Sequence, residues 1–322
     1  MGFRQATNFP GWMAGYGVDH LPSTLIGTCG KIFYVGNRSG LPAGDGTTPE
    51  YPCSTINAAL AKCTSGANDI VFVLPGHAEN ISAADAWSDL VAGTKIIGLG
   101  TGTDRPTFTW TAAAGTILAN VANVRIQNCR FLMAGALGST TALSVTVGIP
   151  VTAAGFEFIG NWVNVGVDAD QLCTDAFTLS AAADDCRFEG NYIFGNAAAE
   201  ITSVITTSAA GADRLKIINN VISADVATAA SGVLLDLDAG AILHNDIIGN
   251  HLANNTASSK YVIDPHANNT GIVHGNVFYV NDGATGPASL GFATYTTDYR
   301  FGLNYCVTAD GASAILSPGA DS

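Results

Sequence analysis

One pattern of eight residues recurs six times along this chain, and it constrains the fold more than any other feature. Most copies read apolar, any, apolar, any, Gly or Asn, Asn, any, apolar. The copies span residues 124–131, 156–163, 186–193, 215–222, 245–252 and 271–278. Their sixth residues, taken as the origin of each repeat, are Cys129, Asn161, Asn191, Asn220, Asn250 and Asn276, at spacings of 32, 30, 29, 30 and 26 residues. Such a period is typical of a chain that folds as a stack of similar units.

Each repeat carries at least two strand signals, one at the origin and one farther along. The later runs lie at 143–147, 177–179, 204–205, 233–237 and 261–263, and at Phe292. The alternate residues before the origins are Ile126, Phe158, Phe188, Ile217, Ile247 and Val273, and those after them are Phe131, Val163, Ile193, Ile222, Leu252 and Phe278. Stacked columns of this kind build a continuous apolar interior, with the intervening residues facing outward. We therefore predict an all-β fold, a single-stranded right-handed parallel β-helix, in preference to a β-sandwich with accidental spacing.

The origins themselves favour asparagine, and the residue before the origin is glycine in four of the six copies. Asn and Gly tolerate a positive φ, so they suit a sharp bend that recurs on every coil. Asparagine side chains that stack in register also hydrogen-bond along the stack. We predict a structural ladder made of Asn161, Asn191, Asn220, Asn250 and Asn276.

The region before the repeats predicts a cap for the stack. The run from Ser54 to Lys62 has the pattern of a short helix with Ser54 as its N-cap, and it presents one apolar face. Buried strands are expected at 70–74 and 95–99. The predicted division is an extended N-terminal arm at 1–30, a β-helix at 31–300 with a cap helix at about 54–64, and a C-terminal tail at 301–322.

Charge limits the partners that the chain can have. Lys and Arg total 13 and Asp and Glu total 26, which gives a net charge of −13. An acidic protein repels phosphate, so we expect no nucleic acid partner. Charged residues make up only 12% of the chain, about half of the usual quarter. Such sparse charge favours a surface that is partly buried against other proteins.

The ends and the cysteines add expectations about compartment. No apolar run is long enough to span a membrane, and the first residues lack the pattern of a secretory signal, so we expect no membrane partner. The seven cysteines form no CxxC pair. They are expected to be reduced thiols packed as small hydrophobic side chains, in a protein made in a reducing cytoplasm.

Two segments carry a resemblance to a known family. The run FYVGNRSGLPAGDGTTPEYPCSTINAALAKC at 33–63, followed by DIVFVLPGHAENI at 69–81, resembles the opening of pectin-lyase-like parallel β-helix proteins. More narrowly, the chain is similar to β-helix proteins that tailed phages encode among their head and virion genes. That likeness lies in residues 6–11 and 27–35 and in residues 300–305, followed by a late Pro318. It implies a virion protein that is either a capsid decoration (cement) protein or tailspike-like.

The acidic residues offer candidates for catalysis. Asp236 and Asp238 form an i, i+2 pair on one strand face, about 6.5–7 Å apart, a separation that suits an inverting glycosidase. Asp184 and Asp213 both lie seven residues before an origin, so they are expected to stack on adjacent coils. Solvated strand carboxylates for Asp236 and Asp238, and conformational turn residues for Asp184 and Asp213, are the preferred explanations of the two pairs. Asp264-Pro265-His266 is read as a turn, with orientation of the imidazole as the alternative.

Other signals of chemistry are weak. Pectin-degrading hydrolases carry Asn-Thr-Asp, Asp-Asp, Gly-His-Gly and Arg-x-Lys in that order, and this chain has only Asp184-Asp185 and Arg214-Leu215-Lys216. No HxH or HExxH spacing occurs, so we expect no metal and no cofactor. Trp162 and Tyr192 face outward on neighbouring coils, where such aromatics bind sugar or mark a protein interface.

These observations favour a structural role without catalysis. We expect a structural virion protein of a tailed bacteriophage, a capsid decoration protein on the capsid exterior that binds the major capsid protein, stabilises the shell and assembles as a homotrimer. The arm residues expected to contact the capsid are Phe3, Phe9, Trp12 and Tyr16. The alternatives are a tailspike-like depolymerase that hydrolyses or lyses host surface polysaccharide through Asp184, Asp213, Asp236 and Asp238, and a non-catalytic glycan-binding fibre that uses Trp162 and Tyr192.

Overall fold

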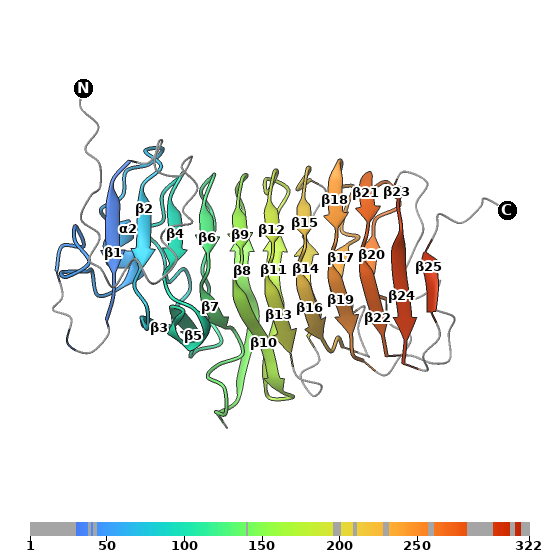
Figure 1. The fold of residues 1–322 in the computed structure, drawn as a ribbon, viewed down its shortest axis with the longest axis horizontal. Coiled ribbons are helices and arrows are strands. Elements are labelled where there is room, and N and C mark those ends of the chain that lie inside the picture. Colours follow the sequence, from blue (N-terminus) through green and yellow to red (C-terminus); the bar gives the residue numbers. More distant parts are fainter. Residues whose placement is uncertain are drawn as a thin grey trace.

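The structure, a computed structural model, is a single-stranded right-handed parallel β-helix of about seven turns, with only 3% of its residues helical (Figure 1). This confirms the predicted fold class. The structure describes residues 30–37, 40, 44–139, 141–195, 201–208, 211–227, 232–256, 261–281, 299–309 and 313–316. The expected arm contacts Phe3, Phe9, Trp12 and Tyr16, and the strand signal at Phe292, lie outside the described residues.

A complete coil contributes one strand to each of three sheets. The first sheet consists, in order, of β1 (Ile32–Val35), β2 (Ile70–Val73), β4 (Lys95–Gly98), β6 (Arg125–Gln127), β9 (Glu157–Ile159), β12 (Arg187–Glu189), β15 (Lys216–Ile218), β18 (Asn245–Ile248), β21 (Gly271–His274) and β23 (Tyr299–Phe301). Every pair of neighbours in it is parallel. The first sheet therefore runs along the whole described length of the stack.

The second and third sheets form the other two faces. The second contains β3 (Ala78–Ile81), β5 (Thr107–Trp110), β7 (Arg130–Leu132), β10 (Trp162–Asp168), β13 (Tyr192–Gly195), β16 (Val221–Ala224), β19 (His251–Asn254), β22 (Val277–Val280), β24 (Asn304–Thr308) and β25 (Ser313–Leu316). The third contains β8 (Leu143–Val151), β11 (Gln171–Leu179), β14 (Ser203–Thr207), β17 (Leu235–Leu237) and β20 (Ile263–Pro265). An antiparallel hairpin between β10 and β11 joins the two sheets.

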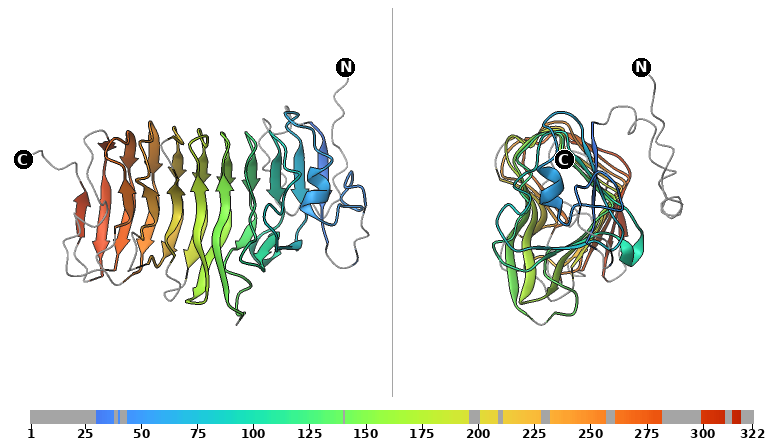
Figure 2. Two further views of the ribbon diagram at one scale, coloured as in Figure 1. Left: turned by 180° about the vertical axis from the view of Figure 1, so that it is seen from behind. Right: turned by 90° about the vertical axis from the view of Figure 1, so that its left-hand side faces the viewer.

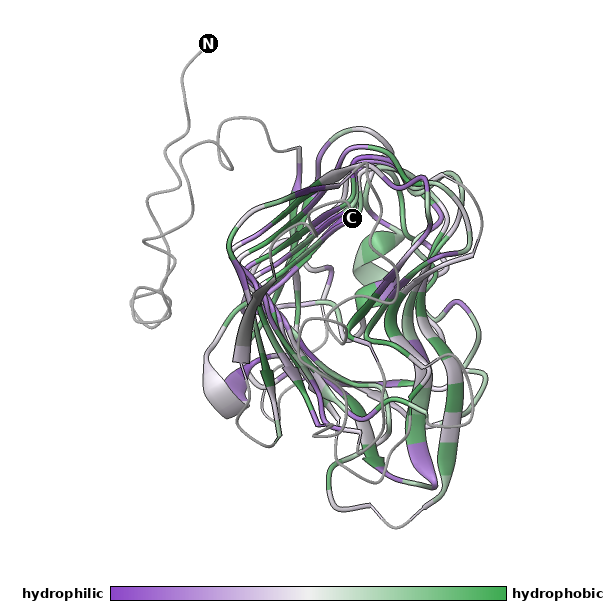
Figure 3. Ribbon diagram, turned by 90° about the vertical axis from the view of Figure 1, so that its right-hand side faces the viewer, coloured by the Kyte–Doolittle hydropathy of each residue, from purple (hydrophilic) through white to green (hydrophobic). Residues whose placement is uncertain are grey.

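The interior is a column of apolar side chains, as the repeat predicts. All the inward residues named for the strands on either side of the origins are at most 1% exposed. Aromatic rings stack through the middle of the column, where Phe131, Phe158 and Phe177 lie with ring centroids 5.3 and 4.8 Å apart along the series. Seen along the axis, the coils superpose, and hydrophobic and hydrophilic residues are interspersed along them (Figure 3). Period-two alternation produces this arrangement because successive strand residues point to opposite faces.

The predicted asparagine ladder is present inside the stack. Each ladder side chain bonds to the preceding coil twice, through its Oδ1 and through its Nδ2. The Asn220 Oδ1 accepts the Asn191 backbone N–H at 3.0 Å, and its Nδ2 donates to the Phe188 carbonyl at 2.9 Å. The same pair of bonds is made by Asn161, Asn191, Asn250 and Asn276. All five side chains are buried, so the ladder satisfies polar groups that would otherwise be buried without partners.

The residue before each origin makes the expected bend. Asn128, Gly160, Gly190, Asn219, Gly249 and Gly275 all have φ between 54° and 68°. Glycine adopts this region without strain, and Asn and Asp adopt it more easily than other side-chain-bearing residues. The Gly/Asn preference before the origin is therefore a backbone requirement that recurs on every coil.

The cap helix is shorter than expected and begins one residue later. Helix α2 spans Ile56–Leu60, and its N-cap is Thr55 rather than Ser54. The Thr55 side chain accepts a hydrogen bond from the Ala58 backbone N–H. The Ile56 N–H, which has no acceptor within the helix, donates to the Glu79 carboxylate of β3. Ile56 and Leu60 join the core, and the helix lies across the N-terminal opening of the coils (Figure 2). The helix thus covers the edge of the stack.

The stack continues beyond residue 300, where a tail was expected. β24 pairs in parallel with β22, and Asn304 adds a further rung by accepting the Asn276 N–H at 3.0 Å. The next strand, β25, then turns back and pairs antiparallel with β24. This reversal covers the edge of β24, because an antiparallel strand cannot start another coil of the same direction.

Replacing Asn220 by Ala is predicted to destabilise the protein by about 3 kcal/mol. The change leaves the Asn191 N–H and the Phe188 carbonyl buried without their partners, at a cost of about 1–3 kcal/mol each. The free energy of unfolding in urea measures the effect. Asn120→Ala, which removes an exposed asparagine, is the control and should change stability by less than about 0.5 kcal/mol. Equal effects of the two substitutions would refute a stabilising ladder.

Candidate functional site

The outer face of the first sheet carries charges of both signs, with more cations than anions. Its in-register column reads Lys95, Arg125, Glu157, Arg187, Lys216, Asp246, Ile272 and Arg300. Arg125 forms an ion pair with Glu157 across strands, whereas Arg187 pairs with Glu189 on its own strand. Exposed pairs of this kind contribute little stability, so this face is mainly a solvated surface.

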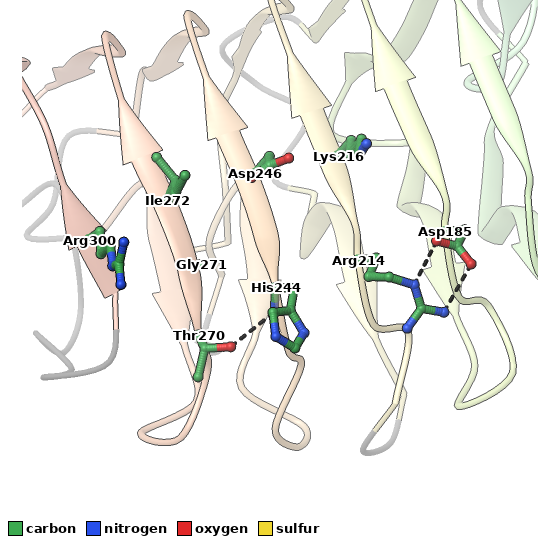
Figure 4. Close-up of a pocket in the computed structure, with 9 residues that line it drawn as sticks. All are labelled: Asp185, Arg214, Lys216, His244, Asp246, Thr270, Gly271, Ile272 and Arg300. Atoms are coloured by element: carbon green, nitrogen blue, oxygen red, sulfur yellow. Dashed lines mark hydrogen bonds and ion pairs between the residues drawn. The ribbon is translucent and has the colours of Figure 1, made fainter.

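A shallow groove of about 660 Å³ lies at the C-terminal part of this face (Figure 4). It is lined by residues of both charges, Asp185, Arg214, Lys216, His244, Asp246 and Arg300 among them. Arg214 donates to both oxygens of Asp185, at 2.7 and 2.9 Å. This contact lowers the pKa of Asp185. One of the three cationic side chains that line the groove, Arg214, is thus already paired within the protein.

Asp184 and Asp213 stack on adjacent coils, at the turns that lead into the first sheet. The Asp184 Oδ1 accepts the Asp213 backbone N–H at 2.9 Å, and the Asp213 Oδ1 accepts the Leu243 N–H at 2.8 Å. The second oxygen of Asp184 lies 3.3 Å from Arg214. Each carboxylate therefore bonds to the next coil, which is a structural use of an aspartate at a turn.

Asp236 and Asp238 lie on the outer face of the third sheet and gain a third acid there. Asp264 of β20 is the in-register partner of Asp236 of β17, so the two are separated by the spacing of neighbouring strands, about 4.8 Å. The strand below places Thr206 in the same column. Asp236 and Asp264 are half-buried and Asp238 is exposed. These three residues are called the acidic cluster below.

Burial and mutual repulsion raise the pKa values of two members of the acidic cluster, Asp236 and Asp264. Burial, together with the carboxylates of Asp238 and Asp236, raises the pKa of Asp264 to about 6. Burial also raises the pKa of Asp236, and it raises that of Asp175, whose Oδ1 accepts a hydrogen bond from Ser203 at 2.7 Å. A carboxylic acid that titrates near neutral pH can act as a general acid.

Two outward columns of the second sheet contain no carboxylate from β7 to β24, and Asp168 lies beyond them at the end of β10. One column reads Arg130, Trp162, Tyr192, Val221, His251, Val277 and Tyr305, and the other reads Leu132, Asn164, Phe194, Ser223, Ala253, Tyr279 and Val307. We call the part on β16, β19, β22 and β24 the neutral strip. Its most exposed large side chains are Val221 and Tyr305, at 42% and 43%.

Trp162 and Tyr192 are neighbours at the other end of this face. They are in-register partners on β10 and β13. Phe194 holds both rings, because its centroid lies 4.4 Å from that of Trp162 and 5.6 Å from that of Tyr192. Tyr192 is 45% exposed. The two aromatic side chains thus form a supported, solvent-facing platform.

Other kinds of site are not seen in the described part of the chain. No group of His, Cys, Asp and Glu among the described residues could hold a metal ion. No helix there is long and apolar enough to cross a membrane. The six described cysteines are free thiols, and burial raises the pKa of Cys129 and Cys186 to about 12. Buried thiols of this kind are unreactive.

Some site residues that were not predicted are nevertheless marked in the sequence by the repeat. Asp264 lies 28 residues after Asp236, one repeat period, and Arg130 directly follows an origin, as Trp162 and Tyr192 do. Aligning the repeats by their third strand would have joined Asp264 to the acidic cluster. Arg105, which lies beside the aromatic platform, comes from a loop with no repeat and had no signal.

The chain has no match among protein-family models, curated proteins or solved structures.

Asp264→Asn is predicted to stabilise the protein at pH 7.5 and to leave its stability unchanged near pH 4. The folded-state pKa of Asp264 is raised to about 6, so the stability that its protonated form provides is present at low pH and lost as the pH rises through 6. The gain at pH 7.5 should be about 1 kcal/mol, reduced by solvent screening of a partly exposed group. Urea unfolding of both proteins at the two pH values measures it, and a pH-independent difference would contradict the raised pKa.

Proposed function

We propose that this chain is a structural protein of a tailed-phage virion, a decoration protein that binds the outer surface of the capsid and stabilises the shell. It would be made in the host cytoplasm and would assemble as a homotrimer on the particle. The sequence resemblance of its opening and closing segments supports this proposal, and so does its form, a rigid rod with a ladder of internal hydrogen bonds.

The observation that carries the proposal is the neutral strip. The chain has a net charge of −13, yet four neighbouring strands present two columns without a carboxylate. Apolar side chains at Val221, Val277 and Tyr305 lie along it. Interfaces are depleted in charged residues at their centre and enriched in tyrosine, and an acidic protein approaches a partner most easily through its neutral face. We therefore assign the strip to contact with the major capsid protein.

Rigidity supports a mechanical role. Every complete coil is bonded to the next by sheet hydrogen bonds and by an asparagine rung, so the strip cannot bend locally without breaking buried bonds. A stiff surface that spans neighbouring capsid subunits opposes their separation. Stabilisation of the shell then follows from binding alone, by mass action.

Tyr305→Asp is predicted to weaken binding to capsids at least tenfold, because it places a charge within the proposed interface. Capsids that lack the protein are mixed with purified variants and sedimented, and the bound copies per major capsid protein are counted. Ile272→Asp is the matched control, since Ile272 is 41% exposed but lies on the first sheet. A wild-type ratio of a few copies per particle, or equal binding by both variants, would overturn the proposal.

A second candidate function rests on the acidic cluster. The carboxylic acid of Asp264, with its pKa near 6, and the nearby Asp236 have the pairing of a general acid with a carboxylate that glycosidases use. The alternative is therefore a tailspike-like enzyme that cleaves host surface polysaccharide by hydrolysis. Its groove would lie along β17 and β20 rather than along the neutral strip.

Release of reducing ends from host polysaccharide tests this alternative. Wild-type protein should release them with an optimum near pH 6, and Asp264→Asn and Asp236→Asn should each reduce the rate at least a hundredfold. Asp213→Asn, which changes a carboxylate at a turn of the first sheet, is the control and should retain the wild-type rate. Absence of release by the wild-type protein would exclude the enzyme.

A further inference from the structure

A second groove lies on the second sheet, away from the neutral strip and from the acidic cluster. It has a volume of about 480 Å³ and is lined by Gly102, Thr103, Arg105, Arg130, Trp162 and Tyr192. The first two belong to the short 3-10 helix η3 (Gly102–Asp104), which follows β4. The others belong to the loop after η3 and to β7, β10 and β13. The volume is within the range of about 300–1,000 Å³ that is typical of small-molecule sites.

Two arginines of this groove have no carboxylate partner. Arg125, Arg187 and Arg214 on the first sheet each pair with an aspartate or glutamate. Neither Arg105 nor Arg130 forms an ion pair with any of the described residues, and the Nε of each is buried without a hydrogen-bond acceptor there. Leaving a charged donor unpaired is costly. In a chain with twice as many acidic as basic residues, two unpaired guanidiniums in one groove point to an external anion.

The aromatic rings complete the groove. The Arg130 guanidinium lies 4.5 Å from the centroid of the Trp162 ring, a cation–π contact that fixes its direction. Phe194 supports Trp162 and Tyr192 from the side. The groove thus offers flat apolar faces beside fixed guanidinium donors, without a loop that must first be ordered.

We propose that this groove binds an acidic oligosaccharide, a chain of sugar rings that carries carboxylate groups. The apolar faces of the rings would stack on Tyr192 and Trp162, and a carboxylate would accept hydrogen bonds from Arg105 and Arg130. The planar guanidinium fits a carboxylate in a bidentate manner. The proposal is independent of capsid binding, because the groove and the neutral strip occupy different strands.

The charge of the whole protein narrows the choice of ligand. Nucleic acid carries about one charge per 1.7 Å and is repelled by a protein of this acidity. A saccharide with one carboxylate per ring or fewer has a lower charge density. The two outward columns of the second sheet described above contain no carboxylate. At physiological salt, carboxylates elsewhere on the surface are largely screened at distances beyond about 8 Å. Asp104, which directly precedes Arg105, is exposed, but it is not among the residues that line the groove. The lining itself therefore carries a net positive charge.

Calorimetric titration with acidic oligosaccharides tests the proposal. The probes are hexasaccharides of mannuronate, of galacturonate and of α-2,8-linked sialic acid, each also in a carboxyl-reduced, uncharged form. At least one acidic probe should bind with a Kd of about 1 mM or tighter, and its reduced form should bind at least tenfold more weakly. Equal affinity for the two forms, or no binding of any acidic probe at 10 mM, would overturn the proposal.

Variants then locate the site. Arg130→Gln, Arg105→Gln and Tyr192→Ala should each weaken binding of that probe at least tenfold. The controls are Arg300→Gln, which changes an exposed arginine on the first sheet, and Tyr305→Ala, whose side chain is 43% exposed against 45% for Tyr192 in the same column. Both should bind within twofold of wild type. If the groove variants bind normally, or the controls weaken as much, the groove is not the site.

Discussion

The bond between an asparagine side chain and the backbone of the preceding coil is the interaction on which the rest of the structure depends. It satisfies an N–H and a carbonyl in the interior, at the point where each coil bends. A slip of one residue in any coil would break these buried bonds and would turn the apolar column outward. The ladder therefore fixes the register of all three sheets, and the rings and aliphatic side chains pack around it.

A fixed register turns every outward position into a column of its own. The mixed charges of the first sheet, the acidic cluster and the neutral strip each occupy a separate face, because neighbouring coils repeat the same offset from the origin. The acidic cluster arises where two successive third strands both carry Asp, at Asp236 and Asp264. The neutral strip arises where four successive strands carry none. The chemical character of each face is thus set by the outward residues along the axis, whereas the inward residues are apolar on all coils.

Much of the fold could be predicted from the sequence because one residue type marks the same place in every repeat. The recurrence of asparagine from Asn161 to Asn276 indicates the repeat period, and it locates the bend and the two apolar columns on either side of it. Asn304 extends the ladder, but it lies in a segment that was expected to be a tail. The N-cap is Thr55 rather than Ser54, and because serine and threonine are both favourable N-cap residues, the sequence alone does not distinguish them. The groove could not be predicted, since Arg105 reaches it from a loop whose path no periodicity determines.

Distances along the axis of the stack are also restricted to multiples of the strand spacing. Each coil adds one strand spacing of about 4.8 Å, so Tyr192 and Tyr305, four strands apart in one column, are held about 19 Å from each other. Point substitutions cannot alter this separation, because no coil can lengthen along the axis. Only the gain or loss of an entire repeat can change it, and then in a single step. Any partner that contacts two places on this rod must match a distance that evolves in jumps.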